Sequence, residues 1–200
     1  HSQITTLGIR LLLGTLIFQS LALLMIYQLH RQREKTQLAR EEYEKRIALQ
    51  SSIERIAKED ALTGLPNRRQ LEETLNSRVA EAKRQNHRLA VLFVDLDNFK
   101  QINDSFGHDV GDQLLKVTAE RMRKALRLSD LMGRFGGDEF VVVLSNIIDN
   151  LEVEHVANKL LESMRPPVQL GSSESFVSAT IGISLFPEDA DETGDLLRHA

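Results

Sequence analysis

Residues 131–144 read LMGRFGGDEFVVVL, and they place a Gly-Gly pair between two apolar flanks. This pattern predicts a β-hairpin, because glycine reaches the positive φ angles that tight hairpin turns need. Upstream, residues 89–94 read LAVLFV, a short apolar run of the length expected for a buried strand. The hairpin and this strand are therefore expected to belong to the central sheet of the protein.

Segments with helical periodicity surround these strands. In residues 68–85 apolar side chains recur every four positions, which favours an amphipathic helix. Further helices are expected at 99–106, 112–126 and 151–164, strands at 168–170 and 176–185, and a helix cut off in progress at 195–200. This alternation of helices and strands predicts an α+β domain in which helices cover a mixed central sheet.

Composition narrows the possible functions. The chain has 200 residues, 42% of them hydrophobic, which is enough for one globular core plus additional segments. Its 25 basic and 29 acidic side chains give a formal charge of −4, so a broad positive surface is absent and a nucleic-acid partner is disfavoured. Because the chain has no cysteine, any bound metal ion must be held by oxygen or histidine ligands.

The N-terminal residues 1–29 are expected to anchor the chain in a membrane as a transmembrane helix. Residues 11–29 are 19 consecutive uncharged residues, and at ~1.5 Å per residue a helix of this length crosses the apolar part of a bilayer. A buried core helix and a signal peptide are the alternatives. Three basic residues follow the span within residues 31–35, whereas Arg10 alone precedes it, which predicts a cytoplasmic C-terminal side.

Residues 30–59 are the expected signalling linker between the span and a domain at residues 60–200. They are rich in charged residues, lack Gly and Pro, and place Leu49, Ile53 and Ile56 at helical spacing. The apolar stripe is short, because charged residues replace it further upstream. A dimerising coiled-coil stalk and a solvated charged helix are therefore both open interpretations.

Two acidic pairs stand at positions suited to bind a cation. Asp95 and Asp97 follow the first strand, and strand periodicity places both on the face opposite Leu96. Asp138 and Glu139 follow the two glycines of the hairpin. Carboxylate clusters on adjacent strands can share Mg²⁺, whereas solubilising acids at a strand end and an ordinary turn are the alternatives.

Four separated segments form one signature: DALTGLPNRR at residues 60–69, FVDLDNFKQINDSFGHDVGD at 93–112, RFGGDEF at 134–140 and SATIGISLFP at 178–187. Together they resemble one known family, the GGDEF-domain diguanylate cyclases. The segments occur in the family's order and at compatible spacing, which makes the signature highly specific. The resemblance covers residues 60–200 and implies that this domain lacks the family's last helix, which bears a lysine and an arginine that contact the triphosphate.

The resemblance implies a ferredoxin-like palm akin to the class III nucleotidyl cyclases. In this family two subunits face each other and each holds one GTP, so that the 3′-hydroxyl of one attacks the α-phosphate of the other. The products are cyclic di-GMP and two pyrophosphates. The chain is therefore expected to be a diguanylate cyclase that acts as a homodimer, through the cyclase domain and helix 30–60, at the cytoplasmic side of a bacterial inner membrane.

The resemblance assigns a metal site and a proton acceptor to the acidic clusters. Asp95, the carbonyl group of Leu96 and Asp138 match the family's ligands for Mg²⁺ or Mn²⁺, with Glu139 as a further ligand. Asp138 also matches the proposed acceptor of the 3′-hydroxyl proton, and Glu139 is the adjacent acid. This assignment suits pyrophosphate displacement, which concentrates negative charge at the α-phosphate.

Contacts to the phosphates are assigned in the same way. Lys100 matches a phosphate-contacting lysine of the family, and His108 is expected near the nucleotide. Gly136 and Gly137 lack β-carbons, so a bound phosphate or sugar can come close to their backbone. A solvated Lys100 and a structural His108 are the alternatives.

Asn103 and Asp112 match the family's guanine-reading residues. Their chemistry suits this task, because an amide can donate to guanine O6 while a carboxylate accepts from N1–H and N2–H. The resemblance therefore implies selection of GTP over ATP. Helix capping is the alternative role for both residues.

Arg127 and Asp130 form an RxxD pattern that matches the family's inhibitory site for the product, away from the active site. Two other functions stay open beside a working cyclase. The domain could be a catalytically silent GTP- or cyclic di-GMP-binding module of a larger signalling protein, or a cyclase for another purine nucleotide. The intact acids at 95, 138 and 139 favour catalysis.

Overall fold

A computed structural model describes residues 2–170 and 173–200, apart from the side chains at 2–13, 15, 17, 35, 38, 39, 41, 170 and 173. The chain divides into two units, residues 1–53 and 54–200. The helices are α1 (Ser2–Lys58), α2 (Arg68–Gln85), α3 (Phe99–Phe106), α4 (His108–Ala125), α5 (Asn150–Met164) and α6 (Thr193–His199). The strands are β1 (Leu89–Leu96), β2 (Leu131–Gly136), β3 (Glu139–Ser145), β4 (Val168–Leu170), β5 (Ser173–Ser175) and β6 (Ala179–Phe186).

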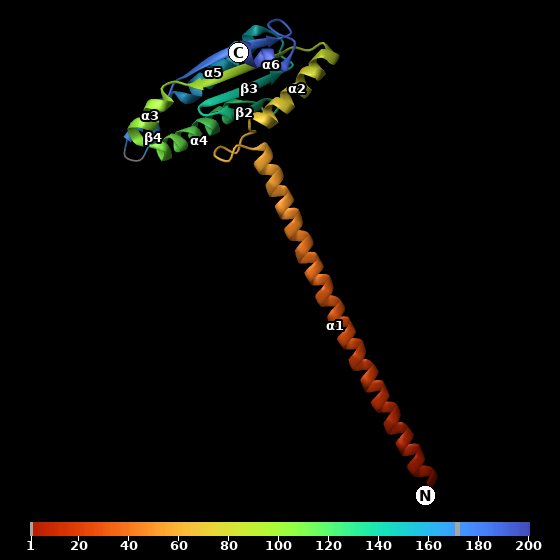
Figure 1. Ribbon diagram of the computed structural model, residues 1–200. Coiled ribbons are helices and arrows are strands. Elements are labelled where there is room, and N and C mark those ends of the chain that lie inside the picture. The colour runs from red at the N-terminus through yellow and green to blue at the C-terminus, as the bar shows by residue number, and fades with distance from the viewer. Residues whose placement is uncertain (1, 171–172) are drawn as a thin grey trace. The chain divides into compact units, whose positions relative to one another are not determined.

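The first unit is helical throughout its described residues, and α1 is continuous through the expected linker (Figure 1). Leu49, Ile53 and Ile56 are exposed on this helix, at 63%, 52% and 75% of their side-chain surface. In the part of the chain that the structure describes, no helix is both long and apolar enough to cross a membrane. The expected span at 11–29 includes residues 11–13, 15 and 17, whose side chains lie outside the described set.

The second unit is built on a four-stranded sheet in the order β2-β3-β1-β6. Every neighbouring pair in this sheet is antiparallel. The expectation of a mixed sheet was therefore wrong for strand pairing, because no two hydrogen-bonded neighbours in this sheet are parallel. The helical crossover α3–α4 does bring β2 parallel to β1, but β3 lies between them and pairs with both.

Helices cover both faces of the sheet (Figure 1). Alternate residues of β1, from Ala90 to Leu96, pack with side chains of α4 and α5 in one core. The intervening residues, from Leu89 to Phe93, pack with α2 and α6 in a second core. This division follows from the period of two along a strand, and it makes β1 a strand buried on both faces, as its continuous apolar run predicts.

Local signals fix the ends of the helices. At α2 the side chain of Asn67 accepts a hydrogen bond from the Gln70 backbone N–H at 3.0 Å, and Asp149 caps α5 in the same way by accepting from Glu152 N at 2.9 Å. The helices expected at 68–85, 99–106 and 151–164 are confirmed to within one residue. α4 begins four residues earlier than expected, and the last strand begins three residues later.

Candidate active site

The acidic residues singled out in the sequence meet where β1 and β3 lie side by side. Asp95 is directly opposite Glu139 in the antiparallel register, so their side chains leave the same face of the sheet. The backbone N–H of Leu96 approaches the carbonyl oxygen of Asp138 at 3.4 Å. Asp95 and Asp138, which are 43 positions apart in the sequence, are therefore neighbours at one end of the sheet.

The electrostatics of this cluster are unfavourable without a cation. Partial burial raises the pKa of the Asp95 carboxyl, and the negative charges of Asp138 and Asp97 raise it further. A divalent cation among these oxygens would relieve the repulsion, and carboxylate and carbonyl oxygens are the ligands that Mg²⁺ prefers. The residues present therefore fit the ion that the sequence signature implies.

The acidic cluster does not form a metal site from side chains alone. Within residues 2–170 and 173–200, no group of three or more His, Cys, Asp or Glu side chains is arranged to hold a metal ion. The assigned donor set differs from such a group, because one of its members is the backbone carbonyl of Leu96. The metal assignment for Asp95, Leu96, Asp138 and Glu139 stays a prediction.

Asp97 has a different role from the one expected for a member of a cation-binding pair. It lies in the turn after β1, and its carboxylate accepts hydrogen bonds from the hydroxyl groups of Ser178 at 2.6 Å and Thr180 at 2.9 Å. Its own N–H donates to the Ser178 carbonyl at 2.9 Å. Asp97 thus fastens the end of β1 to β6, and the acids beside Asp95 come from the β2–β3 turn (Asp138) and the start of β3 (Glu139).

The turn between β2 and β3 presents two exposed glycines. Gly137 has a φ angle of +52°, in the left-handed region that favours glycine. The φ angle of Gly136 is not in this region, so its backbone does not require glycine. A β-carbon added to either glycine would meet no atom of the described residues within 4 Å. Packing within the described chain therefore does not explain a glycine at 136, whereas close approach of a ligand to the backbone does.

Arg134 holds this turn in place. Its Nε and Nη2 groups donate to the carbonyl oxygen of Gly137 at 2.9 and 2.7 Å. Its Nη1 donates to both carboxylate oxygens of Asp60 at 3.0 and 3.1 Å. The arginine is nearly buried, with 14% of its side chain exposed, so the ion pair connects the loop after α1 to the Gly-Gly turn.

Asp60 is well suited to this connection. Burial alone would raise the pKa of its carboxyl, but hydrogen bonds from Thr63 and the bonds and charge of Arg134 outweigh burial, and the net pKa is lowered. Asp60 begins the DALTGLPNRR segment and Arg134 begins the RFGGDEF segment, but the sequence did not predict that the two residues pair. Asp60 and Arg134 stand 74 positions apart, and neither has a local signal that names the other.

A β-bulge between Arg134 and Gly136 brings Phe135 out of the regular ladder. The ring of Phe135 packs edge-on against Phe93 with centroids 5.3 Å apart. The guanidinium carbon of Arg68 lies 4.3 Å from the centre of the same ring. The bulge residue is therefore fixed from two sides, which restricts the turn that follows it.

The assigned nucleotide contacts lie on α3, which begins shortly after Asp97, and on α4, which follows α3. Lys100 is exposed on α3, His108 is exposed at the first turn of α4, and Asp112 is exposed one turn further along. Asn103 is half-buried in the middle of α3. Neither Asn103 nor Asp112 occupies a helix-cap position, which Asn98 and Gly107 take, so the capping alternative is wrong.

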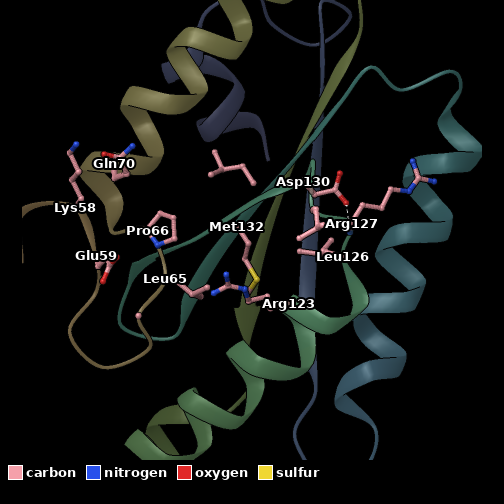
Figure 2. A pocket seen from close by; sticks show the side chains of 13 residues that line it. Lys58, Glu59, Leu65, Pro66, Gln70, Arg123, Leu126, Arg127, Asp130 and Met132 are labelled. Carbon is pink, nitrogen blue, oxygen red and sulfur yellow. Dashed lines mark hydrogen bonds between the residues drawn. The ribbon is translucent and has the colours of Figure 1, made fainter. Parts of the chain in front are cut away.

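Arg127 and Asp130 line a cleft of about 460 Å³ between the loop after α1, the end of α4 and β2 (Figure 2). In Figure 2 they stand on the side of the cleft opposite Lys58 and Glu59. The Asp130 carboxylate accepts from the Arg127 backbone N–H at 2.9 Å. The Arg127 guanidinium forms an ion pair of 2.8 Å with Glu152 of α5.

Comparisons with known proteins agree with this geometry. A family model described as "Diguanylate cyclase, GGDEF domain" matches residues 57–200. The chain is 43% identical over 152 residues to the diguanylate cyclase TpbB of Pseudomonas aeruginosa, covering 75% of this chain and 35% of that protein. It is 41% identical over 150 residues to the cyclic di-GMP phosphodiesterase NbdA of the same species, covering 75% of this chain and 19% of that protein. The chain thus spans about a fifth to a third of these relatives.

Solved structures show the same fold. The GGDEF domain of TpbB from Pseudomonas aeruginosa superposes with a TM-score of 0.68 at 43% identity, covering 70% of this chain and 82% of that one. A sensory box/GGDEF family protein from Caulobacter crescentus gives a TM-score of 0.69 at 35% identity, covering 72% and 92%. The α+β palm expected from the sequence is therefore confirmed.

Proposed function

This chain belongs to the GGDEF family of diguanylate cyclases, and on that premise we propose that the protein condenses two GTP molecules into cyclic di-GMP and two pyrophosphates. The observation that carries the proposal is the convergence of Asp95, Asp138 and Glu139 at one end of the sheet, beside a glycine turn open to a ligand. An acidic cluster with mutual repulsion is costly to keep in a fold, and it is typical of a site for a cation and a phosphate.

The residues act on the reaction as follows. The carboxylate of Asp138 accepts the proton of the 3′-hydroxyl, the 3′-oxygen forms a bond to the α-phosphorus of the second GTP, and the bond from that phosphorus to the pyrophosphate breaks. The 3′-hydroxyl of the second GTP reacts in the same way with the α-phosphorus of the first, which closes the ring and releases the second pyrophosphate. Asp95, the carbonyl of Leu96, Asp138 and Glu139 would hold Mg²⁺ or Mn²⁺. A bound ion would supply positive charge to offset the negative charge that develops at the α-phosphate.

The helices α3 and α4 bind the nucleotide. Lys100 contributes a positive charge to the phosphates, and the exposed backbone at Gly136 and Gly137 leaves space for them. Asn103 and Asp112 read the guanine edge, while His108 lies at the corner between the two helices. This arrangement favours GTP over ATP.

Each domain holds one GTP, so the reaction needs two domains that face each other. The homodimer forms through the cyclase domain and through residues 30–60, where exposed Leu49, Ile53 and Ile56 form one apolar stripe.

The product, cyclic di-GMP, also inhibits the enzyme by binding in the cleft that Arg127 and Asp130 line. Residues 11–29 anchor the protein in the inner membrane with the cyclase domain in the cytoplasm, and cell fractionation tests this location.

The decisive experiment incubates the full-length protein with GTP and Mg²⁺ and measures cyclic di-GMP and pyrophosphate by chromatography. We expect two pyrophosphates for each cyclic di-GMP. Asp138→Asn should lose more than about 10²-fold in turnover, because the proton acceptor is removed. Formation of product by this variant at the wild-type rate contradicts the assigned role. Consumption of ATP in place of GTP indicates a different purine cyclase.

A second candidate function is a silent regulatory domain in a larger protein. The observation that favours it is the 41% identity to NbdA, which is named a phosphodiesterase. Such a domain would bind GTP or cyclic di-GMP without converting GTP. The same incubation distinguishes the two, because a silent domain gives saturable GTP binding and no pyrophosphate.

A further inference from the structure

A glycine on α4 lies against the side chain of Asn103. Gly111 is buried in the first half of this helix. A β-carbon placed on it would stand 1.9 Å from Asn103 Oδ1, 2.9 Å from Asn103 Cγ and 3.2 Å from Phe99 Cζ. Because glycine is unfavourable within a helix relative to alanine, its presence here needs a reason, and the amide of Asn103 occupies the space that a side chain would fill.

The corner between α3 and α4 keeps these two residues together. Gly107, with a φ angle of +88°, is the single residue that joins the helices. Its N–H donates to the Asn103 carbonyl at 2.8 Å, and its own carbonyl accepts from Gly111 N at 3.3 Å. The distance between the two backbones is therefore fixed by hydrogen bonds on both sides of the corner.

In the structure the oxygen end of the Asn103 amide is the end that lies against Gly111. Its Oδ1 atom is buried and has no hydrogen-bond partner among the residues that the structure describes, and a buried polar atom without a partner calls for an explanation. With the oxygen turned inward over Gly111, the NH₂ group is the end of the amide left to meet a ligand. An NH₂ group can donate to guanine O6, whereas the 6-amino group of adenine is itself a donor and gives no such bond.

We propose that Gly111 is a specificity-determining positioning residue, which holds the Asn103 amide with its donor end toward the purine and so selects GTP over ATP. This inference rests on the proposed function, because it assumes that Asn103 reads guanine. Gly111 itself touches no nucleotide and acts through Asn103. The steric conflict in a Gly111→Ala variant is with the tip of a side chain, so Asn103 can turn away while the fold is kept.

The test measures the affinities of the full-length protein for GTP and ATP in the presence of Mg²⁺. In Gly111→Ala we expect the affinity for GTP to fall by about tenfold, the loss of one well-placed hydrogen bond, while the affinity for ATP is unchanged. In turnover assays the KM for GTP should rise with kcat little changed. Gly194→Ala is the matched control, because its β-carbon would meet nothing within 4 Å, and it should behave as wild type.

A double-mutant cycle separates positioning from packing. Asn103→Ala makes room for a β-carbon at 111, so Asn103→Ala with Gly111→Ala should bind GTP as weakly as Asn103→Ala alone. Additive losses, or a folded Gly111→Ala variant with wild-type discrimination between GTP and ATP, overturn the inference. If the wild-type protein itself does not prefer GTP to ATP, the proposed function fails, and the inference fails with it.

Discussion

Asp95 shows at the level of one residue how a functional site can oppose stability. Burial and the neighbouring charges of Asp138 and Asp97 raise the pKa of its carboxyl. A raised pKa in the folded state means that the ionised form is disfavoured by folding. The protonated Asp95 carboxyl therefore favours the folded state relative to the ionised one. This advantage is fully present below the ordinary aspartate pKa of 3.8 and is lost as the pH rises through the pKa of Asp95 in the folded protein. At neutral pH the unliganded protein is therefore less stable than it would be with a neutral residue at 95.

Asp95→Asn should consequently raise the melting temperature of the unliganded protein at pH 7. The rise should be roughly 1–3 °C, a modest value because Asp95 is exposed and solvent screens the repulsion. The gain should shrink as the pH is lowered toward 4. Turnover should be lost in the same variant, and Mg²⁺ with GTP should stabilise the wild type more than the variant. Thermal unfolding at pH 7 and at lower pH, with and without these ligands, checks the three stability outcomes, and an assay of cyclic di-GMP formation checks turnover. A lowered melting temperature at pH 7 contradicts the account.

The residues that could be assigned from sequence are those with a local signal. Asp95 ends an apolar strand, and Asp138 follows a glycine pair in a hairpin turn. Both positions could therefore be placed at the ends of strands without the structure. Gly111 and the Asp60–Arg134 pair could not be found in this way. Their partners are distant along the chain or lie on another helix, and only the packed fold brings them together.

At the level of elements, the ion pair between Asp60 and Arg134 connects the loop after α1 to the β2–β3 turn. Arg134→Ala should lower the free energy of unfolding by about 2 kcal/mol. It removes the charged donor from the half-buried Asp60 carboxylate, which keeps only the hydrogen bonds from Thr63, and it removes the side-chain donors from the Gly137 carbonyl. It should also reduce turnover, since the Gly-Gly turn loses its anchor. Urea unfolding at pH 7 measures the first effect. The matched control is Arg69→Ala, whose exposed pair with Glu73 contributes little.

The pH dependence of the same connection has a defined sign. The net pKa of Asp60 is lowered, so its stabilisation is present above the ordinary aspartate pKa and is lost as the pH falls through the folded-state value. Asp60→Asn should therefore destabilise the protein by a constant amount between about pH 5 and 8, and the difference from wild type should close below about pH 4. A difference that grows on acidification would show that the carboxylate is not stabilised by Arg134.

A second contact between elements is the ion pair of Arg127 with Glu152 on α5. In this pair Glu152 binds the guanidinium group that the proposal assigns to product inhibition. Arg127→Ala should raise the cyclic di-GMP concentration for half-inhibition by more than about tenfold while initial turnover is kept. Glu152→Gln should lower it by about two- to fivefold, because an ion pair between exposed Arg127 and half-buried Glu152, which competes with the product, is removed. Inhibition curves measure both, with Glu154→Gln as the control. Shifts in the same direction for both variants contradict this competition.

The elements themselves were predicted well where the sequence pattern is strong and poorly where it is short. The helices α2, α3 and α5 carry long periodic patterns or clear ends, and they lie where expected. The strand β5 was missed, because three polar residues that pair only with β4 have no pattern of their own. The antiparallel sheet could not be read from the helix–strand alternation, since that order does not say that β3 inserts between β1 and β2.

At the scale of the whole molecule, the proposed reaction needs two chains to meet, and we propose that α1 offers the surface on which they do so. Leu49, Ile53 and Ile56 are exposed at helical spacing in a segment whose other residues are mostly charged, polar or alanine. Burying one such side chain against a partner contributes about 1.5–3 kcal/mol. Ile53→Asp should therefore weaken self-association by about tenfold or more, and turnover per chain should fall with it at equal protein concentration.

Ser51→Asp places the same charge on the opposite side of α1 and should leave association and turnover unchanged. Sedimentation measures the dimer fraction, and the initial rate of cyclic di-GMP formation is measured over a range of protein concentrations. If Ile53 acts through association, a high concentration of Ile53→Asp should restore the wild-type rate per chain, because the active site itself is intact. A variant that remains dimeric yet has lost turnover, or a wild type whose rate per chain is independent of dilution into monomers, would show that this stripe does not assemble the active site.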